Sequence, residues 1–129
     1  MTISNFEDME IWQLARELCR AIYQVTQTRD FQNDLRFCSQ IRAAAGSIMD
    51  NIAEGFEREG KKEFIQFLYI AKGSCGEVRS QLYRALDVNY ISESQCSLLV
   101  NQTTTIGVKI VNLINYLKQT DISGKKFKD

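Results

Sequence analysis

A chain of 129 residues has the size of one ordinary domain, and its 44% hydrophobic and 25% charged residues are typical of a soluble globular protein. Sixteen Lys and Arg balance sixteen Asp and Glu, so no overall positive field draws the chain onto nucleic acid, and any RNA binding must come from local patches. The sequence lacks the roughly 18 to 20 consecutive apolar residues of a membrane span and the start of a signal peptide, so we expect a cytoplasmic protein without a membrane partner.

The residue types that most often carry catalysis and metal binding are scarce. There is no histidine, which removes the usual general base and the histidine ligands of zinc and di-iron sites. The four cysteines, at positions 19, 38, 75 and 96, form no C-x-x-C pair, and we interpret them as reduced, buried residues. A hydrolase using Glu54 and Glu77 is the remaining enzymatic alternative, but no surrounding motif supports it. We therefore expect no catalytic residues, no metal site and no cofactor.

The spacing of the apolar residues predicts four helices. Proline is absent and glycines are few, which permits long helices. Apolar residues recur at alternating steps of four and three, with a polar break at residues 29–33 after the first run. The four runs are Ile11, Ala15, Leu18, Ile22 and Val25; Ile41, Ala45, Ile48 and Ile52; Phe64, Leu68, Ala71, Cys75, Val78, Leu82 and Ala85; and Leu99, Thr103, Ile106, Ile110, Leu113 and Leu117.

Local signals place the helix ends and suggest the topology. The second run ends near Glu57, and Gly60 followed by Glu63 fits the start of the third helix. Residues 92–95, SESQ, match a capping box at the start of the fourth. Because long helices joined by short breaks run antiparallel, we predict an all-α fold, an antiparallel up-down-up-down four-helix bundle, over residues 1–120. Residues 121–129 are predicted to form a flexible basic tail.

Two polar stripes accompany the core on the second and third predicted helices, at positions spaced to share one face of each helix. Their members are Ser47, Asn51, Glu54 and Arg58 on the second helix, and Ser74, Glu77, Gln81 and Arg84 on the third. One interpretation is that these are solvated boundary positions. The other is a polar network between helices or subunits, in which Glu54 and Glu77 pair with Arg58, Lys72 or Arg79. We favour the network as an interface.

The start of the third predicted helix is apolar on almost every side. Phe67 and Ile70 are predicted to point toward the polar stripe rather than the core. Such a patch favours self-association, and the small residues Gly73, Ser74 and Gly76 would let another helix come close. A monomer with a locally apolar surface is the alternative.

Five short motifs are distinctive beyond their helical periodicity. They are MEIWQLA (9–15), QIRAA (40–44), SIMDNIAEGF (47–56), KEFIQFL (62–68) and AKGSCGE (71–77). With Phe6 and Arg58, they resemble the bacterial four-helix bundle proteins encoded in intervening sequences of 23S rRNA genes. The resemblance covers about residues 6–118, and the pair S-I-x-x-N-I-A-E-G and A-x-G-S-x-x-E is its most specific part.

The resemblance implies a small all-helical protein, commonly a ring of five subunits, with no established enzymatic activity. It extends to the accessory bundle proteins of diversity-generating retroelements, which are thought to bind nucleic acid and a reverse transcriptase. Those proteins are strongly basic, whereas this chain is neutral, which argues against a retroelement role. The family signature, to which the resemblance assigns no chemistry, falls on Asn51, Glu54, Gly55, Arg58, Gly73, Ser74 and Glu77.

We therefore predict a non-enzymatic homo-oligomer, a pentamer by resemblance, that associates with RNA, either rRNA or its processed fragments. The predicted RNA-binding residues are Arg58, Lys61 and Lys62. The predicted interface residues are Ser47, Asn51, Glu54, Arg58, Phe67, Ile70, Gly73, Ser74 and Glu77. The alternative is a protein-interaction scaffold with no nucleic-acid role, which the neutral charge and the apolar third helix favour.

Overall fold

The computed structural model describes residues 3–120, and the predicted tail at residues 121–129 lies outside the described residues. The elements are a short 3₁₀ helix η1 (Phe6–Asp8) and the helices α1 (Glu10–Val25), α2 (Arg29–Asn33), α3 (Leu35–Glu57), α4 (Lys61–Asp87) and α5 (Glu93–Gln119). No strand occurs in this part of the chain. The predicted all-α fold is confirmed.

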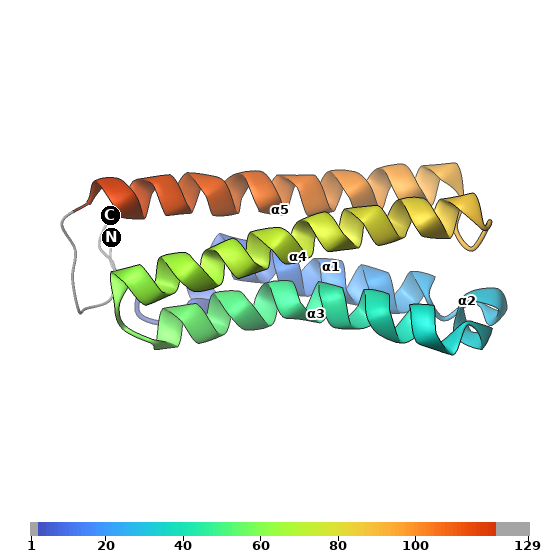
Figure 1. The fold of residues 1–129 in the computed structure, drawn as a ribbon, viewed down its shortest axis with the longest axis horizontal. Coiled ribbons are helices and arrows are strands. Elements are labelled where there is room, and N and C mark those ends of the chain that lie inside the picture. Colours follow the sequence, from blue (N-terminus) through green and yellow to red (C-terminus); the bar gives the residue numbers. More distant parts are fainter. Residues whose placement is uncertain (1–2, 121–129) are drawn as a thin grey trace.

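The four long helices form a bundle whose neighbours are fixed by the short connections. Figure 1 shows α1, α3, α4 and α5 lying lengthwise together, with consecutive long helices running in opposite directions. α1 contacts α3 and α5, and α4 contacts the same two helices, whereas α1 does not contact α4 and α3 does not contact α5. The α4–α5 side of the bundle therefore lies opposite the α1–α3 side.

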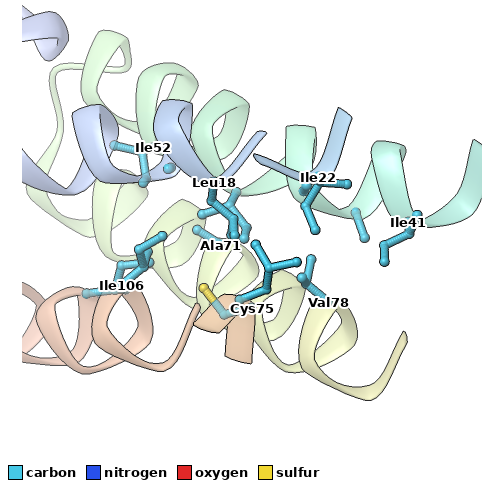
Figure 2. Close-up of a cluster of buried hydrophobic side chains, with 14 of the residues drawn as sticks. Leu18, Ile22, Ile41, Ile52, Ala71, Cys75, Val78 and Ile106 are labelled. Atoms are coloured by element: carbon cyan, nitrogen blue, oxygen red, sulfur yellow. The ribbon is translucent and has the colours of Figure 1, made fainter. Parts of the chain in front are cut away.

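The core is built from the predicted apolar runs. Every predicted core position of α1, α3 and α4 is buried, and Figure 2 shows side chains from all four long helices meeting at its centre. On α5, Leu113 is only partly buried and Ile114 occupies the core. The two neighbouring residues lie on either side of the direction that faces the core, so periodicity alone does not separate them.

The predicted polar break is wrong in one respect, because residues 29–33 form the helix α2 and Phe31 within it is fully buried. The Phe31 ring lies 5.2 Å from the ring of Phe37 and 5.1 Å from that of Tyr90. The Tyr90 hydroxyl donates a hydrogen bond to Asp34, which also accepts one from the Phe37 amide at the start of α3. A single aromatic residue among polar ones has no period, so the pattern does not reveal it.

Helix ends follow the predicted signals. α5 begins with the capping box, in which Ser92 accepts a hydrogen bond from the Gln95 amide and the Gln95 side chain accepts one from the Ser92 amide. Gly60 is the residue before α4, and α3 ends at Glu57. The connection between α3 and α4 is therefore only three residues long, which keeps these two helices in contact along their length.

Candidate functional site

The two polar stripes meet between α3 and α4 of the same chain. The Ser74 hydroxyl donates a hydrogen bond of 3.0 Å to the hydroxyl oxygen of Ser47. The Asn51 side-chain amide donates to the same Ser47 oxygen at 2.9 Å and to the Ser47 carbonyl at 2.8 Å. Ser47 thus links two turns of α3 to α4, and two residues of the family signature, Asn51 and Ser74, are hydrogen-bonded to it.

Gly55, near the end of α3, sets the distance between α3 and α4. A Cβ atom at Gly55 would lie 2.5 Å from the Phe67 Cβ and 3.0 Å from a ring carbon of Phe64. Real Cβ atoms do not approach that closely, and the Phe67 Cβ is fixed to the helix backbone. Only glycine lets α4 pack at this distance. Phe67 is half-buried as a result, and the Arg58 guanidinium lies over its ring at 5.1 Å from the centroid.

The charged members of the stripes pair along their own helices. Arg58 donates to Glu54 at 2.9 Å, and both side chains are 54% exposed. Glu77 accepts a hydrogen bond of 3.4 Å from Gln81. Among residues 3–120, neither Lys72 nor Arg79 forms the ion pair with Glu54 or Glu77 that the sequence suggested. The cross-helix hydrogen bond of the network therefore joins uncharged groups, while Arg58 and Arg84 contact aromatic rings of the facing helix, those of Phe67 and Phe37.

A polar groove of about 560 Å³ lies between α3 and α4 beyond Ser47. Its lining residues are Gln40, Ala43, Ala44, Ser47, Glu77, Ser80, Gln81 and Arg84. Gln81 is 5% exposed, and its side-chain oxygen has no hydrogen-bond partner among the described residues. A buried acceptor without a donor is unfavourable, so a donor reaching into this groove would be bound favourably. Four of the lining residues, Ser47, Glu77, Gln81 and Arg84, belong to the predicted stripes, but the groove itself was not predicted.

The three predicted RNA-binding residues lie together at the α3–α4 turn, but two of them have partners there. Arg58 is held by Glu54 and Phe67, and the Lys61 ammonium donates to the Thr120 carbonyl. Lys62 is exposed. Residues 54–63 carry four Glu and three Lys or Arg, so the turn has no net positive charge.

Part of the predicted apolar patch remains at the surface of α4. Ile70 is 51% exposed and Tyr69 is 47% exposed. Gly73 lies one turn further along, and a Cβ atom there would have no atom within 4 Å. Packing within the chain therefore does not require glycine at position 73.

The cysteines are free, and three of them, Cys38, Cys75 and Cys96, are buried, while Cys19 is half-buried. Burial raises the pKa of the Cys19 and Cys75 thiols to about 11, and it also raises the pKa of Cys96. Thiols of this kind are protonated and weakly nucleophilic at neutral pH.

The part of the chain that the structure describes contains neither a metal site nor a membrane-spanning helix. No group of three or more Cys, Asp or Glu side chains in residues 3–120 could hold a metal ion. Within the same range, none of the helices is both long and apolar enough to cross a bilayer.

A bundle of four long helices, with hydrogen-bonded polar side chains and a close-packed glycine between α3 and α4, defines an all-α bundle protein. The chain belongs to the 23S rRNA-intervening sequence protein family, whose model matches residues 7–112. The resemblance noted in the motifs is thereby confirmed.

Comparison with solved structures supports the same fold. The chain is similar to the crystal structure of a protein of unknown function from the S23 ribosomal protein family of Bacteroides thetaiotaomicron. The TM-score is 0.74 at 23% sequence identity, and the alignment covers 81% of this chain and 97% of that one. No curated protein matches this chain.

Proposed function

We propose that this protein is a non-enzymatic homo-oligomer of the cytoplasm that associates with RNA. The observation that carries the proposal is an uneven distribution of charge. The two halves of the chain carry opposite net charges, although the whole chain is neutral. Residues 3–60 contain six Lys or Arg and ten Asp or Glu, whereas residues 61–120 contain seven and four. Because α4 and α5 form one side of the bundle, that side is positive and can attract phosphates. Membership in a family named after 23S rRNA intervening sequences agrees with an RNA partner.

The proposed self-association uses the part of the α4 surface that borders α3. Ile70 is exposed there, Gly73 leaves room for a close approach, and Gln81 lacks a donor in the adjacent groove. A second copy of the chain would cover Ile70 and supply the missing hydrogen bond. We propose a ring of five subunits, following the resemblance.

The test is binding of the purified, nuclease-treated full chain to structured rRNA fragments and to duplex DNA of matched length at several salt concentrations. The mass of the protein in solution is measured on the same samples. We expect an oligomer whose binding prefers RNA and weakens with salt. Absence of binding at low salt by an intact oligomer would overturn the RNA role, and a monomeric mass would overturn the assembly.

A protein-interaction scaffold is the second candidate, and the exposed apolar side chains favour it. Leu98 and Val108 on α5 are exposed in addition to Ile70 on α4. Pull-downs from lysate with and without nuclease separate the two functions. A protein partner that survives nuclease, together with no binding to purified RNA, would support the scaffold.

A further inference from the structure

A second groove, of about 340 Å³, lies between α4 and α5 on the positive side of the bundle. Its lining residues are Lys72, Cys75, Gly76 and Arg79 from α4, and Thr104, Gly107, Val108, Val111 and Asn112 from α5. None of these residues belongs to the polar stripes or to the α3–α4 turn.

Two cationic side chains, Lys72 and Arg79, line the α4 side of the groove. Lys72 and Arg79 are seven residues apart, so they share a face of α4 and are separated by about 10 Å along the helix. Burial raises the pKa of the Cys75 thiol between them, and Arg79 and Lys72 both oppose that rise, which places both charges near the thiol. Neither side chain forms a hydrogen bond or ion pair with another residue of the range 3–120.

Among residues 3–120, no acidic residue lines this groove. α5 contains no Asp or Glu after Glu93 at its first position. On α4, Glu77 lines the other groove, the one that faces α3, and it accepts a hydrogen bond from Gln81 there. Lys118, near the end of α5, adds a further cation beside Tyr69, to whose hydroxyl it donates a hydrogen bond of 2.7 Å.

Two tyrosines flank the cations on the same face of α4. Tyr69 and Tyr83 are each seven residues from Gly76, and they are 47% and 52% exposed. Tyr83 also lines a neighbouring hollow together with Glu93, Val100 and Asn101 of α5. Exposed aromatic rings next to cations are the elements with which proteins hold unpaired nucleic-acid bases, by stacking the base on the ring.

Gly76 keeps the centre of this surface open. A Cβ atom at position 76 would have no atom within 4 Å, so packing inside the subunit does not explain the glycine. Glycine in the interior of a helix is destabilising relative to alanine. Its effect here is to leave the α4 backbone accessible between Lys72 and Arg79.

We propose that this surface binds single-stranded RNA, with phosphates on the cations and unpaired bases on the tyrosines. We call it the α4–α5 face, and its residues are Tyr69, Lys72, Gly76, Arg79, Tyr83 and Lys118. The inference rests on the proposed RNA association and assigns it to a different surface from the Arg58, Lys61 and Lys62 turn. Single strands are favoured over duplexes because the bases of a duplex are already stacked and paired.

The experiment measures binding of the full chain to a fluorescent, unstructured RNA and to a duplex RNA of the same length, over a series of salt concentrations. For K72Q/R79Q we expect affinity for the single strand to fall at least tenfold. Loss of two phosphate contacts should also reduce the slope of log affinity against log salt by about 1.4. The matched control R20Q/R36Q removes the same charge from exposed positions on α1 and α3 and should leave both quantities close to wild type.

Two further variants separate stacking from charge and test the turn. Y69L and Y83L should each weaken binding roughly tenfold without changing the salt slope, since a base loses its platform while the cations remain. K61Q/K62Q should bind like wild type. Photocrosslinking with 4-thiouridine RNA should give adducts in the peptides that contain Tyr69 and Tyr83.

The possible results test the proposed RNA association and the α4–α5 face separately. If the wild-type chain binds no RNA, the proposed function fails, and this inference fails with it. If the wild type binds but K72Q/R79Q binds equally well, only the α4–α5 face is overturned. If folded K72Q/R79Q has an altered mass in solution, the face lies between subunits, where the acidic α1–α3 side of another copy would meet it, and the inference is also overturned. Helix content and melting temperature, measured on every variant, confirm that each remains folded.

Discussion

Gly55 lies where the backbones of α3 and α4 leave no room for a side chain. A methyl group there would overlap the Phe67 Cβ at 2.5 Å, so the two helices would have to separate. We predict that Gly55→Ala lowers the free energy of unfolding by about 1–3 kcal/mol, although alanine is the better helix former. Urea denaturation measures the effect.

Gly73→Ala is the matched control for this prediction. Gly73, like Gly55, lies within a long helix, in this case α4, but a Cβ atom there meets open space. We expect this variant to be as stable as wild type or more stable by up to about 1 kcal/mol. Equal stability of Gly55→Ala and wild type would show that the α3–α4 contact is looser than the structure has it.

The buried thiols make stability depend on alkaline pH. Burial raises the pKa of Cys19 and Cys75 to about 11, whereas an unfolded cysteine titrates near 9. Between these values the unfolded chain loses thiol protons that the folded chain keeps, so the free energy of unfolding falls as pH rises from about 9 to 11. Below pH 9 the contribution is fully present. Urea midpoints at pH 7, 9 and 10.5 measure the fall.

The control for the thiol prediction is the double variant Cys19→Ala with Cys75→Ala, which lacks both titrating groups. The free energy of unfolding of this variant should fall less over the same pH interval than that of wild type. If the free energy of unfolding fell equally in both proteins, titratable groups other than these two thiols would be responsible for the pH dependence.

At the scale of helical elements, the contact between α3 and α4 combines an uncharged hydrogen-bond network with a charged pair that stays on one helix. Ser47→Ala removes the acceptor of Ser74 and one acceptor of Asn51. We predict a loss of about 1–3 kcal/mol in the free energy of unfolding, because partly buried donors are left unpaired. Ser47→Ala with Ser74→Ala should cost less than the sum of the two single changes, since they remove the same bond.

Glu54→Ala is the comparison for this network. The Glu54–Arg58 pair is exposed and spans one helical turn, so its removal should cost no more than about 0.5 kcal/mol. A larger loss, or a change in mass, would indicate that the pair also contacts a neighbouring subunit, as the sequence suggested. Denaturation and mass in solution are measured on the same preparation.

At the scale of the whole molecule, the exposed apolar surface of α4 tests the proposed assembly. We predict that Ile70→Glu lowers the mass of the protein in solution while leaving its helix content unchanged, because the side chain is 51% exposed in the single subunit. Tyr23→Glu, at a comparably exposed position on α1, is the control and should keep the wild-type mass. Retention of the oligomer by Ile70→Glu would exclude this surface as the subunit contact.

Much of the fold could be predicted because the apolar period is regular in every long helix. α4 repeats its core positions from Phe64 to Ala85 without interruption, and all of them are buried. The α2 segment could not be predicted, since Phe31 acquires its role only when the chain reversal brings it against Phe37 and Tyr90. A single residue carries no period from which a buried position could be inferred.

The candidate surfaces were predictable only in part. Spacing placed Ser47, Asn51 and Ser74 on facing sides of two helices, but it could not say that the charged members of the stripes would pair along one helix instead of across. The sequence pattern did not predict the α4–α5 face. The groove beside Lys72 and Arg79 is completed by residues of α5, which lies far along the chain.

By itself, the sequence determined that this chain is an all-α bundle of the 23S rRNA-intervening sequence protein family, since helical period, capping residues and family motifs are properties of neighbouring residues. Tertiary structure alone decided the close contact at Gly55, the unpartnered oxygen of Gln81 and the groove between α4 and α5. These depend on distances between atoms of different helices. Such distances are set by how side chains pack together, and no local pattern encodes them.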